Sequence, residues 1–267
     1  MIGIDVSKHN GSIDFNKVKA DGYDFVIIRA GYGKSTKDSK FDDNIRKALA
    51  AGLKVGAYWF IYAKTGNDIL GNVKMAHAVL NNWKDNITMG VWADYEYDSD
   101  KYVGRQLSVQ ERTAWVKAFI EGMKGNGYDC GLYANPDYLD NKFGNLKAYN
   151  LWIARYTTDE NKVKDYKPFM WQYSSTGKVN GINGNVDLNK CEWLGLTAPK
   201  KCCGIVTTNG SNLMLRNEPS TKGQILKKIP NGKQIGILDK DKYSGKWYKV
   251  RYEDTTGYAF SKYIKEI

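Results

Sequence analysis

The chain has 267 residues, of which 42% are hydrophobic, 13% aromatic and 26% charged, a composition that excludes disordered and collagen-like chains. Lysine and arginine exceed aspartate and glutamate by 11 charges, so we expect a diffuse attraction to polyanions such as nucleic acid or an anionic cell wall. No window holds the roughly 18 apolar residues that a membrane span needs, and the N-terminus lacks the pattern of a signal peptide.

Short apolar runs alternate with amphipathic stretches over about the first 190 residues. The runs expected as strands are 2–6, 25–30, 55–60, 91–94, 131–134, 151–154, 169–172 and, more weakly, 186–188. The longest helix-like stretches between them are 41–51, 67–83 and 109–124. This pattern predicts an α/β fold, a closed or nearly closed parallel barrel of the TIM type. Because the last three runs have short or polar connections, we expect an irregular barrel with fewer than eight helices.

The composition changes near residues 197–204, where Pro, Gly and Lys interrupt the pattern and predict a linker. Shorter runs then follow at 213–216, 225–229, 234–238, 247–251 and 257–260. Turn residues separate these runs, which is typical of a small all-β barrel. We therefore divide the chain into a body (1–195), a linker (196–205) and a β module (206–267), and the module carries 6 of the 11 net charges.

Two carboxylates end the fourth run, in the segment Trp92-Ala93-Asp94-Tyr95-Glu96. On an extended strand, residues i and i+2 point to the same face with Cα atoms about 6.6 Å apart. Asp94 and Glu96 should therefore share a site, where like charges push their pKa values apart so that one carboxyl stays protonated. That pairing is what glycoside hydrolysis requires. A solvated acidic turn is the alternative for an isolated Asp-x-Glu.

The position of this pair favours catalysis, because barrel enzymes place their chemistry at the carboxyl ends of the strands. Asp5 ends the first run and Asp187 ends the eighth. The first and eighth strands of a closed barrel are neighbours, so both aspartates could approach the pair around one mouth. Each could instead serve as a helix cap or a turn residue.

Aromatic side chains and one glutamine gather near the same strand ends, and would suit the apolar faces of sugar rings. They are Tyr32, Tyr58, Trp59, Phe60, Tyr62, Tyr95, Trp152, Tyr156, Trp171, Gln172 and Tyr173. With two histidines and four cysteines, a zinc site, a histidine-based triad and a disulfide scaffold are all poorly supplied. We expect no metal and no cofactor, ordinary polar roles for His9 and His77, and mostly free thiols.

These motifs together resemble glycoside hydrolase family 25, the Chalaropsis-type lysozymes of bacteria and phages, over about residues 1–195. The resemblance rests on GIDVS (3–7), FVIIRAGYG (25–33), GAYWF (56–60), WADYE (92–96), WIARY (152–156), WQY (171–173) and VDLN (186–189). It departs from many relatives at 29–33, where they carry a stretch like Lys-Ala-Thr-Glu-Gly. The family implies an N-acetylmuramidase that cleaves the bond between N-acetylmuramic acid and N-acetylglucosamine.

By this resemblance Glu96 would be the general acid and Asp94 its partner. Asp94 would either attack the anomeric carbon or stabilise a substrate whose own 2-acetamido group attacks. Asp5 and Asp187 would complete the acidic floor of the cleft. The residues implied to bind substrate are Tyr32, Tyr58, Tyr62, Gln172 and Arg29, with Trp152 and Trp171 as cleft walls.

The C-terminal segment is similar to the bacterial SH3 (SH3b) domain, which in lytic enzymes usually binds peptidoglycan. The similarity rests on LMLRNEPS (213–220), GKQI (232–235), GKWYKVRY (245–252) and GYA (257–259). Together the two resemblances indicate a modular endolysin of a phage or prophage, made in the bacterial cytoplasm and released to the wall with the help of a holin. A bacterial autolysin is the alternative source.

Other functions remain open from sequence alone. A barrel scaffold that binds the wall without catalysis is one, because fold does not fix function. Cleavage on the glucosamine side, or of chitin, is another. We expect peptidoglycan as the partner, with no membrane and no specific nucleic acid, because no nucleic-acid motif accompanies the positive charge.

Overall fold

The computed structural model describes residues 1–146, 148–191, 202–239, 246–253 and 255–266. It divides into two compact units, Met1–Leu196 and Thr197–Ile267, and each is described by itself. Most of the predicted linker, residues 196–201, lies outside the described residues. Its last part, 202–205, belongs to a strand of the second unit, because Cys202–Val206 pairs on both sides with neighbouring strands.

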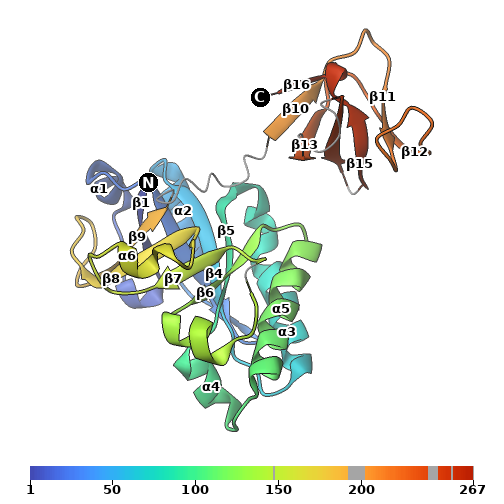
Figure 1. The fold of residues 1–267 in the computed structure, drawn as a ribbon. Coiled ribbons are helices and arrows are strands. Elements are labelled where there is room, and N and C mark those ends of the chain that lie inside the picture. Colours follow the sequence, from blue (N-terminus) through green and yellow to red (C-terminus); the bar gives the residue numbers. More distant parts are fainter. Residues whose placement is uncertain (147, 192–201, 240–245, 254, 267) are drawn as a thin grey trace. The chain divides into compact units, whose positions relative to one another are not determined.

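The first unit is built around a closed ring of eight strands (Figure 1). They are β1 (Ile2–Val6), β2 (Phe25–Tyr32), β4 (Lys54–Phe60), β5 (Ile87–Asp94), β6 (Cys130–Ala134), β7 (Leu151–Ala154), β8 (Met170–Gly177) and β9 (Val186–Cys191). Pairing of β1 with both β2 and β9 closes the ring, and the short strand β3 (Thr36–Lys37) extends β2 outward. The predicted α/β barrel is therefore confirmed.

Strand β9 departs from the predicted all-parallel barrel, because it runs antiparallel to both β1 and β8. The loop from β8 to β9 holds no helix, and a parallel return needs a crossover of a dozen or more residues. The reversal places the start of β9, and not its end, at the mouth of the barrel. Asp187 pairs there with Asp5 across the two strands. The two aspartates are neighbours, as predicted, but the predicted parallel direction of β9 is wrong.

Six α-helices occur among the described residues, fewer than a regular barrel of this size carries. They are α1 (Phe15–Ala20), α2 (Phe41–Ala50), α3 (Gly66–Leu80), α4 (Tyr97–Val103), α5 (Val109–Gly125) and α6 (Asn161–Lys164). The longer ones cover the outside of the barrel (Figure 1). Helix α5 begins at the N-cap Ser108, whose hydroxyl accepts the backbone N–H of Glu111, and buries Val116, Phe119 and Ile120. Short helical turns complete the unit: η1 (Lys8–Asn10), η2 (Asn81–Asn86) and η3 (Tyr138–Lys142).

The inside of the barrel follows from the alternation of side chains along each strand. Val26 and Ile28 of β2 belong to the large outer core with the helices, whereas Phe25 and Ile27 belong to a separate inner cluster. Further residues of that inner cluster are Met89, Trp92, Tyr133, Trp152, Met170 and Cys191. Gly131 leaves room for the Trp92 indole, since a Cβ atom there would lie 2.6 Å from the ring. The interior of the barrel below its mouth is therefore apolar and closely packed.

The second unit is a seven-stranded antiparallel sheet in the order β12-β11-β15-β14-β13-β10-β16. Its strands are β10 (Cys202–Val206), β11 (Leu213–Arg216), β12 (Ile225–Ile229), β13 (Gln234–Asp239), β14 (Trp247–Tyr252), β15 (Thr255–Phe260) and β16 (Ile264–Glu266), with the turn η4 (Ser261–Tyr263) before the last. Its core contains Val206, Leu215, Val250 and Ile264. The predicted small all-β module is confirmed, with β10 and β16 in addition to the five predicted strands.

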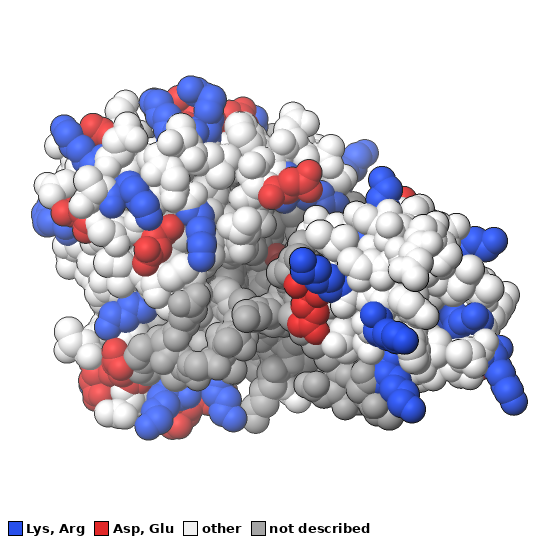
Figure 2. Space-filling model, turned by 90° about the horizontal axis from the view of Figure 1, so that it is seen from above, with Lys and Arg blue, Asp and Glu red and all other residues white. Residues whose placement is uncertain are grey.

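The remaining surface features concern charge, membranes and thiols. On the face seen in Figure 2, lysine and arginine side chains are scattered over the described surface of both units and are not gathered in one patch. None of the described helices combines the length and the apolar character needed to cross a membrane. Cys130 is a free, buried thiol and Cys191 is also buried, whereas the side chains of Cys202 and Cys203 lie outside the described residues.

Candidate active site

A pocket of about 270 Å³ opens where the barrel strands end. It is lined by Asp5, Ser7, His9, Arg29, Tyr58, Phe60, Asp94, Glu96, Tyr133, Trp152, Tyr156, Gln172 and Asp187. All four predicted acidic residues are brought together here, with four of the predicted substrate-binding residues: Arg29, Tyr58, Trp152 and Gln172. The lining residues come from all eight barrel strands and from the segments next to them. Carboxylates, aromatic rings and one guanidinium therefore face the same small volume.

Asp94 and Glu96 form the centre of this pocket. Asp94 is the last residue of β5 and is 4% exposed, and Glu96 follows it with an extended backbone (φ −132°, ψ −174°) and is half-buried. Burial is the largest cause that raises the pKa of each carboxyl, and the charge of Glu96 raises that of Asp94 further. The direct interaction of the two carboxyls raises the pKa of Asp94 and lowers that of Glu96. They therefore share a proton at a pH where free carboxylates would both be ionised.

Asp5 and Asp187 form a second acidic pair. Asp5 Oδ2 accepts hydrogen bonds from Gln172 Nε2 and Asn189 Nδ2, both at 2.8 Å. Burial and the neighbouring charge of Asp187 raise the pKa of Asp5 to about 8, in spite of these hydrogen bonds. Burial raises the pKa of Asp187 to about 6. Near neutral pH this pair therefore carries about one negative charge and not two.

A hydrogen-bond network orients the groups around Asp5. The hydroxyls of Tyr133 and Tyr156 donate to Gln172 Oε1 at 2.9 and 3.2 Å, so the amide of Gln172 is turned with its nitrogen toward Asp5. Trp152 Nε1 donates to Asn189 Oδ1 at 2.8 Å, which orients the second amide in the same way. The floor of the pocket is therefore fixed by buried neutral donors.

Arg29 brings a positive charge to the acidic pocket. Its Nε donates to Asp38 Oδ2 at 2.7 Å, and its side chain is 12% exposed. Within the described part of the chain, Arg29 Nη2 and Asp94 Oδ1 are buried atoms without a hydrogen-bond partner. Such unsatisfied groups are costly unless a ligand or water completes them. Both residues line the pocket, so one unpaired donor and one unpaired acceptor lie next to it.

The predicted residues Tyr32 and Tyr62 lie beside the pocket and do not line it. The ring of Tyr62 lies 4.8 Å from that of Phe60, a lining residue, and 5.8 Å from that of Tyr32. Tyr62 is close enough to the acidic groups that, after burial, the charge of Asp98 raises its pKa. The half-exposed Tyr102 stacks on Tyr62 at 4.8 Å. These rings extend the aromatic surface outward from the pocket.

Trp171 was predicted as a cleft wall, and the structure corrects this. Trp171 and Gln172 are successive residues of β8, so their side chains point to opposite faces. Because Gln172 faces the pocket, Trp171 faces outward, where it is 1% exposed and packs with Ile153 and Val163. Its indole N–H donates to the carbonyl of Arg155 at 2.7 Å.

Several lining residues were not among the predicted site residues. Tyr133 is one of them, and its level beside Asp94 in the β5–β6 register would have indicated its place. Asn189 does not line the pocket but donates to Asp5 Oδ2. His9, interpreted from the sequence as an ordinary polar residue, also lines the pocket. Among the described residues no cluster of three or more His, Cys, Asp or Glu side chains is arranged to hold a metal ion.

Comparisons with known proteins agree with both units. Residues 4–182 match the glycosyl hydrolases family 25, and residues 211–265 match the bacterial SH3 domain. The autolytic lysozyme of Clostridium acetobutylicum is 32% identical over 71% of this chain and 55% of its own length. Lysozyme M1 of Streptomyces globisporus is 30% identical over 70% of this chain and 66% of its own length.

The solved structures give the same result. The modular autolysin LytC of Streptococcus pneumoniae, in complex with a synthetic peptidoglycan ligand, superposes with a TM-score of 0.62 at 26% identity. That match covers 70% of this chain and 46% of LytC. The chain thus spans about half to two thirds of the length of these relatives.

Proposed function

The chain belongs to glycosyl hydrolases family 25, and from this premise we propose that it hydrolyses peptidoglycan as an N-acetylmuramidase. The bond cleaved is the β-1,4 linkage between N-acetylmuramic acid and N-acetylglucosamine. The observation that carries the proposal is the carboxyl pair Asp94–Glu96, which lines the pocket at the end of β5 and whose pKa values are both raised by burial. The names of the lysozymes that the chain resembles support the same substrate.

Glu96 is proposed as the general acid. It is the more exposed member of the pair, so a glycosidic oxygen can reach it, while Asp94 lies deeper at 4% exposure. Burial raises the pKa of Glu96 above its usual value, which favours the protonated form that a general acid needs. Proton transfer from Glu96 to the leaving oxygen would leave its carboxylate able to activate the water that completes hydrolysis.

Asp94 is proposed to stabilise the positive charge that develops at the anomeric carbon. It does so either as a nucleophile or by holding the 2-acetamido group while that group attacks. The buried acceptor Asp94 Oδ1 and the buried donor Arg29 Nη2 fit an acetamido group, which presents one N–H and one carbonyl. Asp5, Asp187 and Gln172 form the polar floor beneath the sugar.

The aromatic residues are proposed to bind the glycan strand. Tyr58 and Trp152 are ring neighbours at 6.2 Å that line the pocket, and Tyr156 stands 59% exposed at its edge. Tyr62 and Tyr32 continue the surface away from the acids. Apolar C–H faces of sugars pack well on such rings.

The β module, residues 206–267, is proposed to bind the cell wall and to keep the catalytic domain, residues 1–195, at its substrate. Tethering of this kind raises apparent affinity by about two orders of magnitude without new contacts. A role as a phage or prophage endolysin, released to the wall with a holin, fits this two-part organisation. A bacterial autolysin would need the same chemistry.

The identity of the new reducing ends tests the proposal. Purified peptidoglycan is digested with the protein, reduced with borohydride and examined by mass spectrometry. Muramitol ends are expected. Glucosaminitol ends would instead indicate a glucosaminidase, and binding to the wall without any new ends would indicate a non-catalytic scaffold.

A further inference from the structure

Glu96 occupies the N-terminus of the short helix α4. Its backbone N–H donates to Ser99 Oγ at 3.2 Å, and its carbonyl accepts the backbone N–H groups of Ser99 and Asp100 at 2.9 and 3.3 Å. The direction of the Glu96 side chain therefore depends on where α4 is held. A helix of seven residues cannot fix its own position, because short helices are marginal in water.

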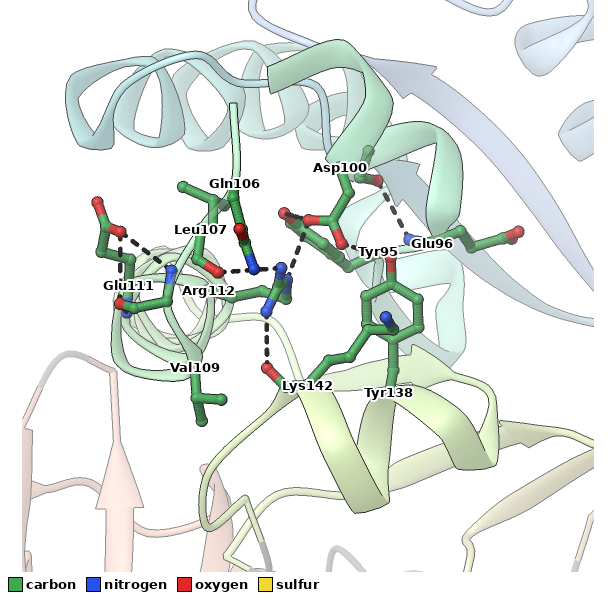
Figure 3. Close-up of polar contacts among 12 residues, drawn as sticks. Tyr95, Glu96, Asp100, Gln106, Leu107, Val109, Glu111, Arg112, Tyr138 and Lys142 are labelled. Atoms are coloured by element: carbon green, nitrogen blue, oxygen red, sulfur yellow. Dashed lines mark hydrogen bonds and ion pairs between the residues drawn. The ribbon is translucent and has the colours of Figure 1, made fainter. Parts of the chain in front are cut away.

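The side chain of Asp100 attaches α4 to the wall of the barrel. Its Oδ1 accepts hydrogen bonds from Tyr95 Oη at 2.8 Å and Arg112 Nε at 3.0 Å, and its Oδ2 accepts one from Tyr138 Oη at 2.7 Å (Figure 3). Burial alone would raise the pKa of Asp100, but these hydrogen bonds lower it below its usual value. Asp100 is therefore a carboxylate when the enzyme works, as three donors require.

Arg112 extends the attachment to two further segments. Its Nη1 donates to the carbonyl of Lys142 at 3.0 Å, at the end of η3, and its Nη2 donates to the carbonyl of Leu107 at 3.4 Å, just before α5. The Arg112 side chain is 9% exposed and that of Asp100 is 25% exposed. The ion pair thus joins α4, α5 and η3 in a partly desolvated setting, where such contacts hold geometry well.

Tyr95 makes the attachment specific for Glu96. It lies between Asp94 and Glu96 on the chain, so its side chain points away from the pocket while theirs point into it. Its ring is 1% exposed and its hydroxyl reaches Asp100. In Figure 3 the Glu96 side chain extends away from the network that holds its backbone. Asp100 is consequently linked to Glu96 in two ways, through the side chain of the preceding Tyr95 and through its own backbone N–H, which donates to the Glu96 carbonyl.

We propose that Asp100 is a positioning residue that holds Glu96 at the leaving-group oxygen through the network with Tyr95, Arg112 and Tyr138. The inference rests on the proposed role of Glu96 as general acid. Displacement of a catalytic group by about 1 Å can cost 10²-fold in rate. The network acts on the direction of the acid, whereas the sugar-binding rings Tyr58 and Trp152 stand on β4 and β7.

The test compares Asp100→Asn with wild type and with Glu111→Gln. Glu111 pairs with Arg105 on the surface next to the network and has no contact with Asp100, so it serves as the matched control. For Asp100→Asn, kcat on solubilised peptidoglycan chains is expected to fall about 10- to 100-fold, with KM changed by less than about 2-fold. For Glu111→Gln, both constants should stay within about 2-fold of wild type.

The pH dependence of kcat separates positioning from stability. A loosened Glu96 becomes better solvated, so its pKa falls and the alkaline limb of the profile moves to lower pH. The titratable groups around Glu96 are unchanged in these variants: Asp5, Asp94, Asp98, Tyr133, Tyr156 and Asp187. Tyr138→Phe keeps the charge of Asp100 and removes one donor. It should show a smaller fall in kcat, about 3-fold, with a limb shift in the same direction.

The outcomes are distinct. Wild-type kcat and an unshifted limb in folded Asp100→Asn would overturn the positioning role while the proposed function stands. If Asp100→Asn does not fold, an unchanged limb and kcat in Tyr138→Phe would overturn it equally. A wild-type protein that produces no new reducing ends would overturn the proposed function and this inference together.

Discussion

The lower and upper parts of the barrel interior are made by the same strands but hold opposite kinds of side chain, apolar below and mostly polar or charged at the mouth. Phe25 and Ile27 of β2 pack among apolar neighbours, and two residues further along the same face Arg29 enters the pocket. Strand β5 repeats the pattern with Trp92 followed by Asp94. The lower part is satisfied by packing, whereas the upper part buries acids that repel one another. Residues that stabilise the core and residues of the site are therefore only two positions apart on the same face of a strand.

This difference means that the mouth stores unfavourable electrostatic energy which the apolar interior offsets. Buried carboxyls with raised pKa values destabilise the folded state near neutral pH. Substitutions in the two parts should consequently have opposite signatures. Changes at the mouth should remove activity and preserve or raise stability. Changes below the mouth should lower stability and preserve activity.

Asp94→Asn should give the largest effect of the three substitutions that compare the two parts of the barrel. The amide keeps the shape of the side chain but cannot carry the negative charge that stabilises the developing cation, so we expect kcat to fall about 10²- to 10³-fold. The measurement is the rate of release of new reducing ends from peptidoglycan. Asp137→Asn, at an exposed carboxylate that accepts from Tyr97, is the control and should leave this rate unchanged. Full activity of Asp94→Asn would remove Asp94 from the chemistry.

Ile27→Ala tests the apolar lower part of the barrel. Ile27 is fully buried, and its truncation should lower the free energy of unfolding by about 2–4 kcal/mol. Urea denaturation measures the loss, and Ile27→Leu, which conserves volume, should cost less than about 1.5 kcal/mol. The kcat of the folded Ile27→Ala protein should stay within a few-fold of wild type. A drop in kcat as large as that of Asp94→Asn would show that the two parts are not separable.

Asp5→Asn is expected to have the smallest effect, a gain in stability. The asparagine Oδ1 can still accept from Gln172 and Asn189, and the buried charge is removed. The pKa of Asp5 is raised from 3.8 to about 8, so the folded protein binds a proton that the unfolded chain releases. Wild-type stability therefore falls as pH rises between these values, and the variant lacks this slope.

At pH 8 the variant should be more stable than wild type by about 1–3 kcal/mol, and the difference should shrink toward pH 4. Urea denaturation at both pH values tests this. A difference that is the same at pH 4 and pH 8 would contradict the buried, protonated state of Asp5.

Much of this arrangement could be predicted from the sequence, because strand periodicity and strand ends are local signals. The run that ends in Asp94-Tyr95-Glu96 is one example, and the extended backbone at Glu96 accounts for the shared face of the two acids. The proximity of Asp5 and Asp187 followed from closure of the ring alone, and the cross-strand pairing agrees.

The features that could not be predicted from the sequence depend on tertiary contacts. The direction of β9 is set by its pairing with β1 and β8, and no local pattern in Val186–Cys191 encodes it. Trp171 was assigned to the cleft from the family resemblance, although its neighbour Gln172 occupies the inward face. The Asp100–Arg112 pair joins residues twelve apart whose meeting depends on the packing of α4 against α5.

The most direct measurement of the central claim compares wild type and Glu96→Gln on purified peptidoglycan by mass spectrometry after borohydride reduction. Glutamine preserves the size of the side chain and removes the transferable proton, so muramitol ends should appear with wild type and fall at least about 10³-fold with the variant. The unfolding transition of the variant should match or exceed that of wild type. Muramitol release by Glu96→Gln at a rate near that of wild type would contradict the role of Glu96 as the general acid.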